Sequence, residues 1–359
     1  MNASEIDLLA QWVRDGMPEG DPSDLPPARE FYDGWLHGTP DVVMVQDEEY
    51  VIDPRGPADD YRNFVFVNDS GKDWLVNTYE ILPGNHRVVH HVLLFVDHTG
   101  ISEKLDARAK GPGYSANGAG GFPGFVPKGV MGGWAPGNGP HVLPEGMVNV
   151  IPAGARIVMQ IHYHKTGKEE RDRTKLALYL AKGEVTRAAT ALPLEPLNSR
   201  TGGLRIPPNA SNHEIKASFN MPRSLIAVSV TPHMHLLGKD MKVDARLPDG
   251  TVIPLVYVKT WDFNWQETYY FKEPIHLPAG TNIEMLAHYD NSAANPANPN
   301  SPPNWVTWGE GTNDEMCMAF IEVAYQEPTP YGQALQEPSM FELLGREIRR
   351  TVGNLLRRQ

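Results

Sequence analysis

Short strand-like segments recur along most of this chain and constrain its fold more than any other feature. From about residue 50 onward, apolar and polar residues alternate in segments such as NFVFV, DWLVNTYEI and HRVVHHVLLFV. A period of two is typical of strands that bury one face. The sequence contains 33 glycines and 32 prolines, together 65 of its 359 residues. This share is well above the roughly 12% that these two types usually make up. The sequence therefore predicts an all-β protein of many short strands joined by turns.

The first 50 residues differ from the rest. Residues 4–16 place Ile, Leu, Trp and Val at helical spacing, which predicts a short amphipathic helix with Ser4 as its N-cap. The acidic stretch that follows is rich in proline and glycine and is expected to be extended. Residues 1–50 are therefore predicted to form a helix followed by an extended arm.

The remaining chain divides into three predicted parts. Residues 51–195 and residues 196–335 are each rich in strands, and the stretch PLEPLNSRTGG marks the boundary between them. Residues 336–359 have apolar residues at helical spacing together with five arginines, which predicts a basic amphipathic helix. A helix docked on the protein is favoured for this tail over one that binds a membrane surface or a partner.

Charge and cysteine content narrow the classes of function. The formal net charge is −12, which argues against nucleic acid or an anionic membrane as the main partner. Cys317 is the only cysteine, so no intrachain disulfide can form, and it is expected to be a small core residue. The sequence has no apolar run of the ~18 residues that would predict a transmembrane helix. Its first residues lack the pattern of a signal peptide, so we expect either a cytosolic protein or part of a longer exported one.

Two adjacent histidines occupy the middle of an apolar strand. Side chains alternate between the faces of a strand, so His90 and His91 should point in opposite directions. Both rings can reach one metal ion only if the strand ends, twists or bulges at this point. Otherwise, one ring faces the core and must bind a backbone group. From these residues alone, both interpretations remain open.

Two other strands place histidines on one face. In RIVMQIHYHK, the residues Gln160, His162 and His164 share a polar face that could line a cleft. In VTPHMHLLG, His233 and His235 lie two residues apart and project to the same side, with Cα atoms roughly 6.6 Å apart. This spacing is common among metal ligands, but a hydrogen-bonded pair on a solvated face is an equally open alternative.

A third element is the segment NDEMCMAFIEV. Met316, Met318 and Phe320 share one face of this predicted strand. Such a stripe more often belongs to a core than to a metal site. A thioether beside imidazoles nevertheless selects copper, above all Cu(I).

Together these segments resemble the copper type II, ascorbate-dependent monooxygenases, the family of peptidylglycine α-hydroxylating monooxygenase and dopamine β-monooxygenase. The matching segments are, in order, VVHHVLLF, MQIHYH, PHMHLLGK and TNDEMCMAFI, and GVMGGWAPGNGPHVLPEGM also resembles the family. The resemblance spans about residues 60–325. It implies two consecutive jelly-roll β-sandwich domains, each of which carries one copper ion.

The resemblance also implies a role for individual residues. The first copper ion would accept and relay an electron, and the second would activate dioxygen and hydroxylate a substrate C–H bond. Gln160 matches a glutamine that the family has beside the first site. His162 is preferred over His164 as a ligand because QIHY matches the family motif. The implied ligands are His90, His91 and His162 for the first copper and His233, His235 and Met316 for the second.

The sequence departs from the peptide-amidating members at three positions. Those members hold the substrate carboxylate with an arginine, an asparagine and a tyrosine, where this chain has Thr231, Met318 and Phe320. Loss of an ionic partner typically costs several kcal/mol. These residues are expected to form an apolar substrate pocket. We therefore expect a small, largely apolar organic substrate and no peptide amidation.

The source of electrons is expected to lie outside this chain. Residues 5–44 resemble the segment that follows a c-type cytochrome or redoxin module in bacterial members. The haem-attachment motif C-x-x-C-H is absent from the sequence. Ascorbate or a separate redox protein is therefore the expected reductant. The resemblance implies export to a bacterial periplasm, although a cytoplasmic location stays open.

Two other functions remain alternatives at this point. One is a non-catalytic copper-binding or electron-transfer protein on the same scaffold. The other is a hydrolytic site for zinc or another metal, which Met316 disfavours because thioether is a poor zinc ligand.

Overall fold

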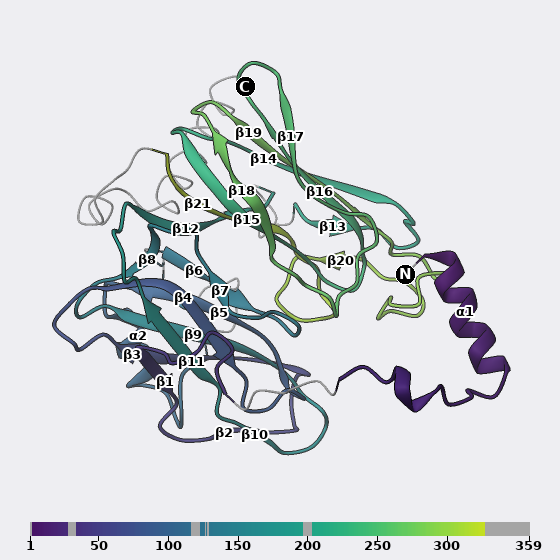
Figure 1. Ribbon diagram of the computed structural model, residues 1–359, viewed down its shortest axis with the longest axis horizontal. Coiled ribbons are helices and arrows are strands. Elements are labelled where there is room, and N and C mark those ends of the chain that lie inside the picture. The colour runs from purple at the N-terminus through teal and green to yellow at the C-terminus, as the bar shows by residue number, and fades with distance from the viewer. Residues whose placement is uncertain are drawn as a thin grey trace. The chain divides into compact units, whose positions relative to one another are not determined.

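The computed structural model describes residues 2–27, 34–115, 123–125, 127, 129–196 and 203–326. The helix predicted for residues 336–359 lies outside the described residues. The chain forms two compact units, Met1–Gly34 and Trp35–Gln359. Almost all of the regular secondary structure described in the second unit is strand, so the predicted all-β class is confirmed (Figure 1).

The first unit contains helix α1 (Ala3–Arg14) and the 3₁₀ turn Pro22–Asp24. The predicted N-cap at Ser4 is wrong, because Asn2 caps the helix. The side chain of Asn2 accepts a hydrogen bond from the Glu5 amide, and the Glu5 carboxylate accepts one from the Asn2 amide. This reciprocal capping box satisfies two backbone donors at once, which leaves Ser4 inside the first turn.

The first sandwich packs two antiparallel sheets around one apolar core. In one of these sheets, strand β9 (Arg156–His164) pairs with a strand on each side, and its buried residues include Ile157, Met159 and Ile161. Strand β1 (Val42–Val45) lies within residues 1–50, where the sequence predicts an extended arm. One sheet has the order β3 (Asp59–Val67), β9 (Arg156–His164), β5 (Val89–Asp97) and β6 (Gly129–Trp134). The other has the order β1 (Val42–Val45), β11 (Lys175–Leu180), β4 (Trp74–Leu82) and β8 (Met147–Ile151).

Shorter elements complete this sandwich. They are β2 (Tyr50–Ile52) paired with β10 (Glu170–Asp172), β7 (His141–Val142) paired with β4, and helix α2 (Ile101–Asp106).

The second sandwich is built in the same way around a separate core. Cys317 is buried in that core, as predicted. One sheet has the order β14 (His213–Asn220), β19 (Asn282–Tyr289), β16 (Gly238–Arg246) and β17 (Val252–Val258). The other has the order β12 (Arg187–Leu194), β21 (Cys317–Tyr325), β15 (Leu225–Met234) and β18 (Tyr269–Leu277). Strands β13 (Arg205–Ile206) and β20 (Val306–Thr307) form a small separate pair.

A continuous sheet joins the two sandwiches. Strand β12 pairs in parallel with β8 of the first sandwich and antiparallel with β21 of the second. Figure 1 shows β12 between the strands of the first sandwich below and those of the second above. The sheet that contributes one layer to each sandwich is therefore nine-stranded among the described residues.

A buried polar network fastens this seam. His141 on β7 bonds the Tyr270 hydroxyl on β18 at 2.6 Å and the Glu322 carboxylate on β21 at 3.1 Å. Ser229 on β15 donates to the second oxygen of Glu322, and the Tyr79 ring stacks on His141 at 4.5 Å. Satisfied buried networks restrict a fold to one arrangement. This network thus helps to fix one sandwich against the other.

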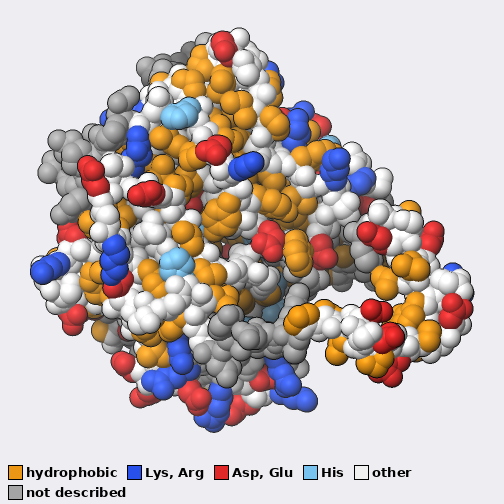
Figure 2. Space-filling view, viewed as in Figure 1, with side chains coloured by type: hydrophobic (Ala, Val, Ile, Leu, Met, Phe, Trp, Pro, Cys, Tyr) orange, Lys and Arg blue, Asp and Glu red, His pale blue; other side chains and the backbone are white. Residues whose placement is uncertain are grey.

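The surface carries both signs of charge. On the face shown in Figure 2, acidic and basic side chains are interspersed among apolar ones. No described helix has both the length and the apolar character needed to cross a membrane.

The central strand β9 should be the part of the first sandwich most sensitive to loss of volume. Replacing Met159, which is fully buried, by alanine should lower the free energy of unfolding by about 2–5 kcal/mol, because a cavity remains. The Val67→Ala variant, at a position that is 41% exposed, should stay within about 0.5 kcal/mol. Denaturant unfolding of both variants measures the difference. Equal stabilities would contradict the assignment of this core.

Candidate functional site

A bulge in strand β5 turns two adjacent histidines toward the same place. Val89 pairs with Tyr163 on β9, but the next paired residue is His91, opposite His162, so His90 is an extra residue in the ladder. A bulge of this kind breaks the alternation of side chains. The Nδ1 atoms of His90 and His91 consequently lie 3.2 Å apart. Of the two interpretations of the pair, the structure supports the convergent one.

His162 completes a group of three imidazoles. Its Nδ1 lies 3.3 Å from the Nδ1 of His91, and one ligand atom from each ring lies within 4.8 Å of the others. Imidazole nitrogens about 2.0–2.1 Å from a shared ion lie roughly 3–4 Å apart. The three rings thus fit one metal ion. His164, the rival of His162, has a side chain that is 49% exposed and lies outside this group.

The protonation state of these rings suits metal binding. Burial lowers the pKa of His90 to about 3, with neighbouring imidazoles adding to the effect. Burial also lowers the pKa of His91 and that of His162, although Asp59 opposes the shift at His162. The Nε2–H of His162 donates to Asp59 Oδ1 at 2.9 Å. That bond selects the tautomer whose Nδ1 lone pair is free for a metal.

A second pair of histidines projects from β15. The rings of His233 and His235 lie 5.2 Å apart. His235 Nδ1 donates to the Asp314 carbonyl at 3.1 Å, and His233 Nδ1 lies 2.6 Å from Gln266 Oε1. Gln266 uses its amide nitrogen to donate to a carbonyl, so its oxygen is the acceptor. Both rings therefore carry their proton on Nδ1 and have Nε2 free.

Burial keeps these two rings neutral as well. It lowers the pKa of His233 to about 4 and that of His235 to about 3. Neutral imidazole is the form that binds metal ions.

Met316 lies directly before strand β21 and is held by its backbone. Its carbonyl accepts from the Tyr289 hydroxyl at 2.8 Å, and its amide donates to Glu315 at 3.1 Å. Met316 lines the same cavity as His233. Two imidazoles and a thioether form a soft donor set, which suits copper and is poor for zinc. The chemistry of the donors thus fits the copper ion that the family resemblance implies.

The two groups of candidate ligands lie side by side. The ring centroids of His91 and His233 are 6.2 Å apart. The ring of Phe263 stacks on His90 at 4.8 Å and meets the edge of His235 at 5.8 Å. A single aromatic ring therefore touches a histidine of each group.

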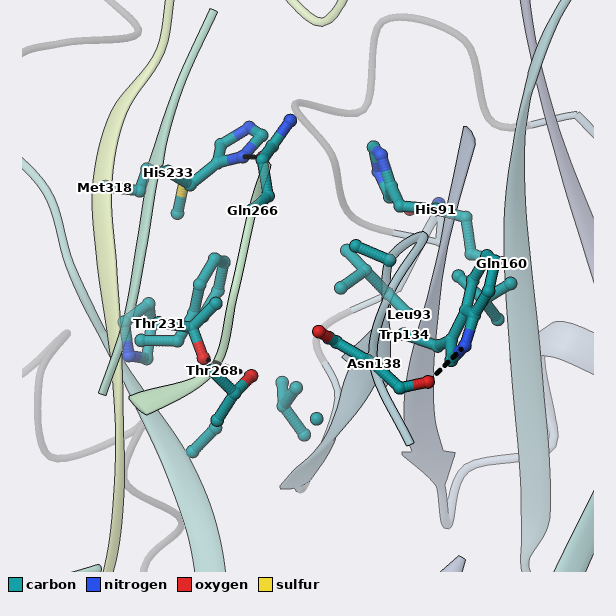
Figure 3. A pocket seen from close by; sticks show the side chains of 18 of the residues that line it. His91, Leu93, Trp134, Asn138, Gln160, Thr231, His233, Gln266, Thr268 and Met318 are labelled. Atoms are coloured by element: carbon teal, nitrogen blue, oxygen red, sulfur yellow. Dashed lines mark hydrogen bonds between the residues drawn. The ribbon is translucent and has the colours of Figure 1, made fainter. Parts of the chain in front are cut away.

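A cavity of about 130 Å³ opens between the groups. Figure 3 shows His91 and Gln160 on one side of it and His233 and Gln266 on the other. All the predicted pocket residues line it, namely Thr231, Met318 and Phe320. Most of the remaining wall is apolar, from Leu93, Phe95, Val130, Trp134, Ala191 and Pro193. Among the described residues, no lysine or arginine lines the cavity, whereas the acidic residue Glu310 does.

Gln160, which lines this cavity, has a buried oxygen without a hydrogen-bond partner among the described residues. The Asn63 amide nitrogen donates to the Tyr114 carbonyl, so the Asn63 oxygen accepts from Gln160 Nε2 at 3.1 Å. This chain of bonds fixes the orientation of the Gln160 amide. Its Oε1 is buried without a partner among the described residues.

Sequence reasoning missed several residues that support the histidines. Asp59 and Tyr61 lie on strand β3 beside His162, and Gln266 lies at the start of the segment that leads into β18. In the sequence, Asp59 and Tyr61 alternate with Asp60 and Arg62. Asp59 and Tyr61 would therefore share one face of a strand, but this pattern is only a weak sign that the face is polar. Only the pairing of β3 with β9 shows that this face adjoins His162.

Comparison with known proteins gives one family. Residues 198–336 match the family model described as copper type II ascorbate-dependent monooxygenase, C-terminal domain. The matched range contains His233, His235 and Met316. A search of curated proteins gave no match.

Solved structures of infectious bursal disease virus proteins show only weak similarity. The VP2 subviral particle is 8% identical over 83% of this chain and 74% of that chain, with a TM-score of 0.22. The Gt strain structure is 8% identical over 79% and 70%, with a TM-score of 0.21. The Gx strain structure is 7% identical over 80% and 77%, with a TM-score of 0.20. Scores this low support no argument about fold or function.

The two histidines of β9 should differ in copper binding. The His162→Ala variant should lose one copper ion per chain after chelator washing, because it removes one ring of the three-imidazole group. The His164→Ala variant should retain the parent copper content, because this ring lies outside the group. Metal analysis of the reconstituted proteins measures both. Copper loss in His164→Ala alone would show that the ligand assignment is wrong.

The buried histidines should make the metal-free protein sensitive to acid. The pKa values of His90, His233 and His235 lie at about 3, about 4 and about 3 in the folded state, below the roughly 6.5 of the unfolded chain. As pH falls below 6.5, the unfolded state gains protons first, so stability that is present above this pH is lost.

Each such histidine should lower the free energy of unfolding by on the order of 1 kcal/mol per pH unit in this window. Denaturant unfolding of chelator-treated protein between about pH 7 and pH 5 measures the slope. A stability that stays flat in the parent would contradict the buried, neutral state of the rings.

Proposed function

We propose that this protein is a copper-dependent monooxygenase. The premise is that residues 198–336 belong to the copper type II ascorbate-dependent monooxygenase family. The protein hydroxylates a C–H bond of a small, largely apolar organic molecule by means of dioxygen and an external reductant. The observation that carries the proposal is the cavity between the two ligand groups, because a substrate placed there lies beside both.

The proposed copper ligands are the two groups described above. His90, His91 and His162 would hold the first ion, and His233, His235 and Met316 the second. When bound, copper supplies one-electron transfer at the first site and activation of dioxygen at the second. The side chains of Asp59 and Gln266 and the Asp314 carbonyl orient the rings by holding the nitrogen opposite each proposed ligand atom.

The wall of the cavity supports an uncharged substrate. Thr231, which stands where the peptide-amidating members have arginine, bonds the hydroxyl of Thr268 at 2.9 Å. A substrate carboxylate would find no cationic partner among the described lining residues. Loss of such a partner typically costs 2–5 kcal/mol. The aromatic and aliphatic walls would instead bind an apolar body and exclude water from it.

The reductant and the location remain proposals that rest on the family resemblance. Ascorbate or a separate protein, such as a c-type cytochrome or a redoxin, would supply electrons. The resemblance to bacterial members supports a periplasmic or otherwise exported protein.

Oxygen consumption tests the proposed activity. Copper-loaded protein with ascorbate should consume dioxygen only when a suitable small apolar substrate is added, and the product should contain one added oxygen atom by mass spectrometry. A glycine-extended peptide should give no turnover. Oxygen consumption that never depends on a substrate would favour the non-catalytic copper protein instead.

A matched pair of methionine variants tests the second site. Met316→Leu should lower kcat at least about 100-fold, because loss of a ligand should exceed the 10–100-fold effect of losing a group that merely supports one. Met241→Leu, in the fully buried core of the same sandwich, should keep the parent rate, because it removes a thioether while conserving volume. Equal rates in both variants would remove Met316 from the proposed ligands.

A further inference from the structure

One loop contacts both groups of proposed ligands. Residues 308–316 connect β20 with β21, and we call this segment the bridging loop. At its start, the Glu310 carbonyl accepts from the Tyr61 hydroxyl of the first sandwich at 2.6 Å. The amide and the hydroxyl of Thr312 donate to the two oxygens of Asp59, each at 2.9 Å. Three hydrogen bonds thus tie the loop to strand β3.

The same two residues of β3 hold His162. Asp59 Oδ1 accepts from His162 Nε2, and the Tyr61 ring stacks on the imidazole with centroids 4.2 Å apart and planes 7° from parallel. The Asp59 side chain is only 15% exposed, so water competes little for its oxygens. Any change in the position of His162 therefore acts on the two residues that also hold the loop.

The other end of the loop fixes the second group of ligands. The Asp314 carbonyl accepts from His235 Nδ1 at 3.1 Å. The buried Glu315 carboxylate accepts from the amides of His235 and Leu237 at 2.9 and 2.7 Å. Met316 follows directly. The loop thus sets the position of two of the three proposed ligands at the second site.

We propose that the bridging loop couples the two metal sites, so that copper at the first site raises the affinity of the second site for copper. Asp59 and Tyr61 are the positioning residues that transmit this coupling. The inference rests on the proposed function for the presence of two copper sites. It goes further, because it assigns a thermodynamic link between them to named residues.

The physical basis is the cost of ordering the loop. A metal bond at His162 Nδ1 fixes the ring and makes its Nε2–H a stronger donor to Asp59. Asp59 then holds Thr312 in place and lowers the remaining mobility of the loop. The second copper binds to ligands that are already ordered, which raises its affinity. By linkage, the second copper must raise the affinity of the first site by the same factor.

A thermodynamic cycle tests the coupling. The probe is Cu(I), added anaerobically to the full chain from a competing chelator. The affinity of the second site is compared between the parent and His91→Ala, which disables the first site but leaves the bond of His162 to Asp59. The copper-binding step that is absent from the titration of Met316→Ala is assigned to the second site. The parent should bind copper there at least about 5-fold more tightly than His91→Ala does.

The double variant Tyr61→Phe/Thr312→Val removes two of the three tethers. It keeps the aromatic ring on His162 and the Thr312 backbone donor. The coupling factor is the ratio of copper affinities at the second site without and with His91→Ala. In the double variant it should fall at least about twofold, towards one. Tyr50→Phe is the matched control, because the Tyr50 hydroxyl bonds Asp60 in the same sandwich and does not contact the loop. Its coupling factor should equal that of the parent.

Hydrogen exchange gives a second readout that needs no activity. In the Met316→Ala background, one equivalent of Cu(I) should slow exchange of the bridging-loop amides, and the double variant should weaken this effect. Equal second-site affinity in the parent and His91→Ala would overturn the inference but leave the proposed function intact. The double variant could also weaken copper binding at the second site equally in the parent and in His91→Ala. That result would show that the tethers have a purely structural role, and it would overturn the inference. A parent that binds no copper at the second site would overturn both.

Discussion

An extra residue in strand β5 is the constraint on which the site depends. A regular strand would send His90 and His91 to opposite faces, and one imidazole would enter the apolar core. The bulge at His90 brings both Nδ1 atoms to the same side, where His162 of the neighbouring strand meets them. Burial of these polar rings costs free energy, but it also keeps the rings neutral, which is the state that a metal requires.

The contact between the two ligand groups depends in turn on how the sandwiches are joined. Each group projects from its own sandwich, yet His91 and His233 come within 6.2 Å. The continuous sheet and the bonds of His141 to Tyr270 and Glu322 hold the seam on one side. The bridging loop holds it on the other through Asp59 and Tyr61. The cavity is therefore bounded by two sandwiches that are fastened at two places.

Local sequence patterns predicted the strands and the grouping of histidines on their faces. Alternation alone placed His233 beside His235, and it placed Gln160 and His162 on one face of a strand, as the structure shows. The bulge could be named only as one of two options, because a ladder irregularity depends on the partner strand. The family resemblance, rather than the pattern, selected the ligand sets, which remain predictions until a metal is measured.

The errors and omissions arise where the outcome depends on distant or competing partners. Ser4 is a good N-cap residue by type, but Asn2 and Glu5 form two reciprocal bonds and determine where the helix begins. Asp59 lies 103 residues from His162 and 253 from Thr312, so no local pattern could reveal that it serves both. Such residues become visible only when the register of β3 with β9 is known.

Because the two sandwiches share a sheet, the family match and the folding unit begin at different residues. The family match begins at residue 198, after strand β12 has ended at Leu194. Yet β12 pairs with β21 along six residues and contributes Leu192 and Leu194 to the core of the second sandwich. A protein cut at the family boundary would leave β21 as a bare edge strand beside an opened core. Unpaired edges of this kind recruit other chains and promote aggregation. The smallest piece of this chain that retains an intact second sandwich must therefore begin upstream of β12.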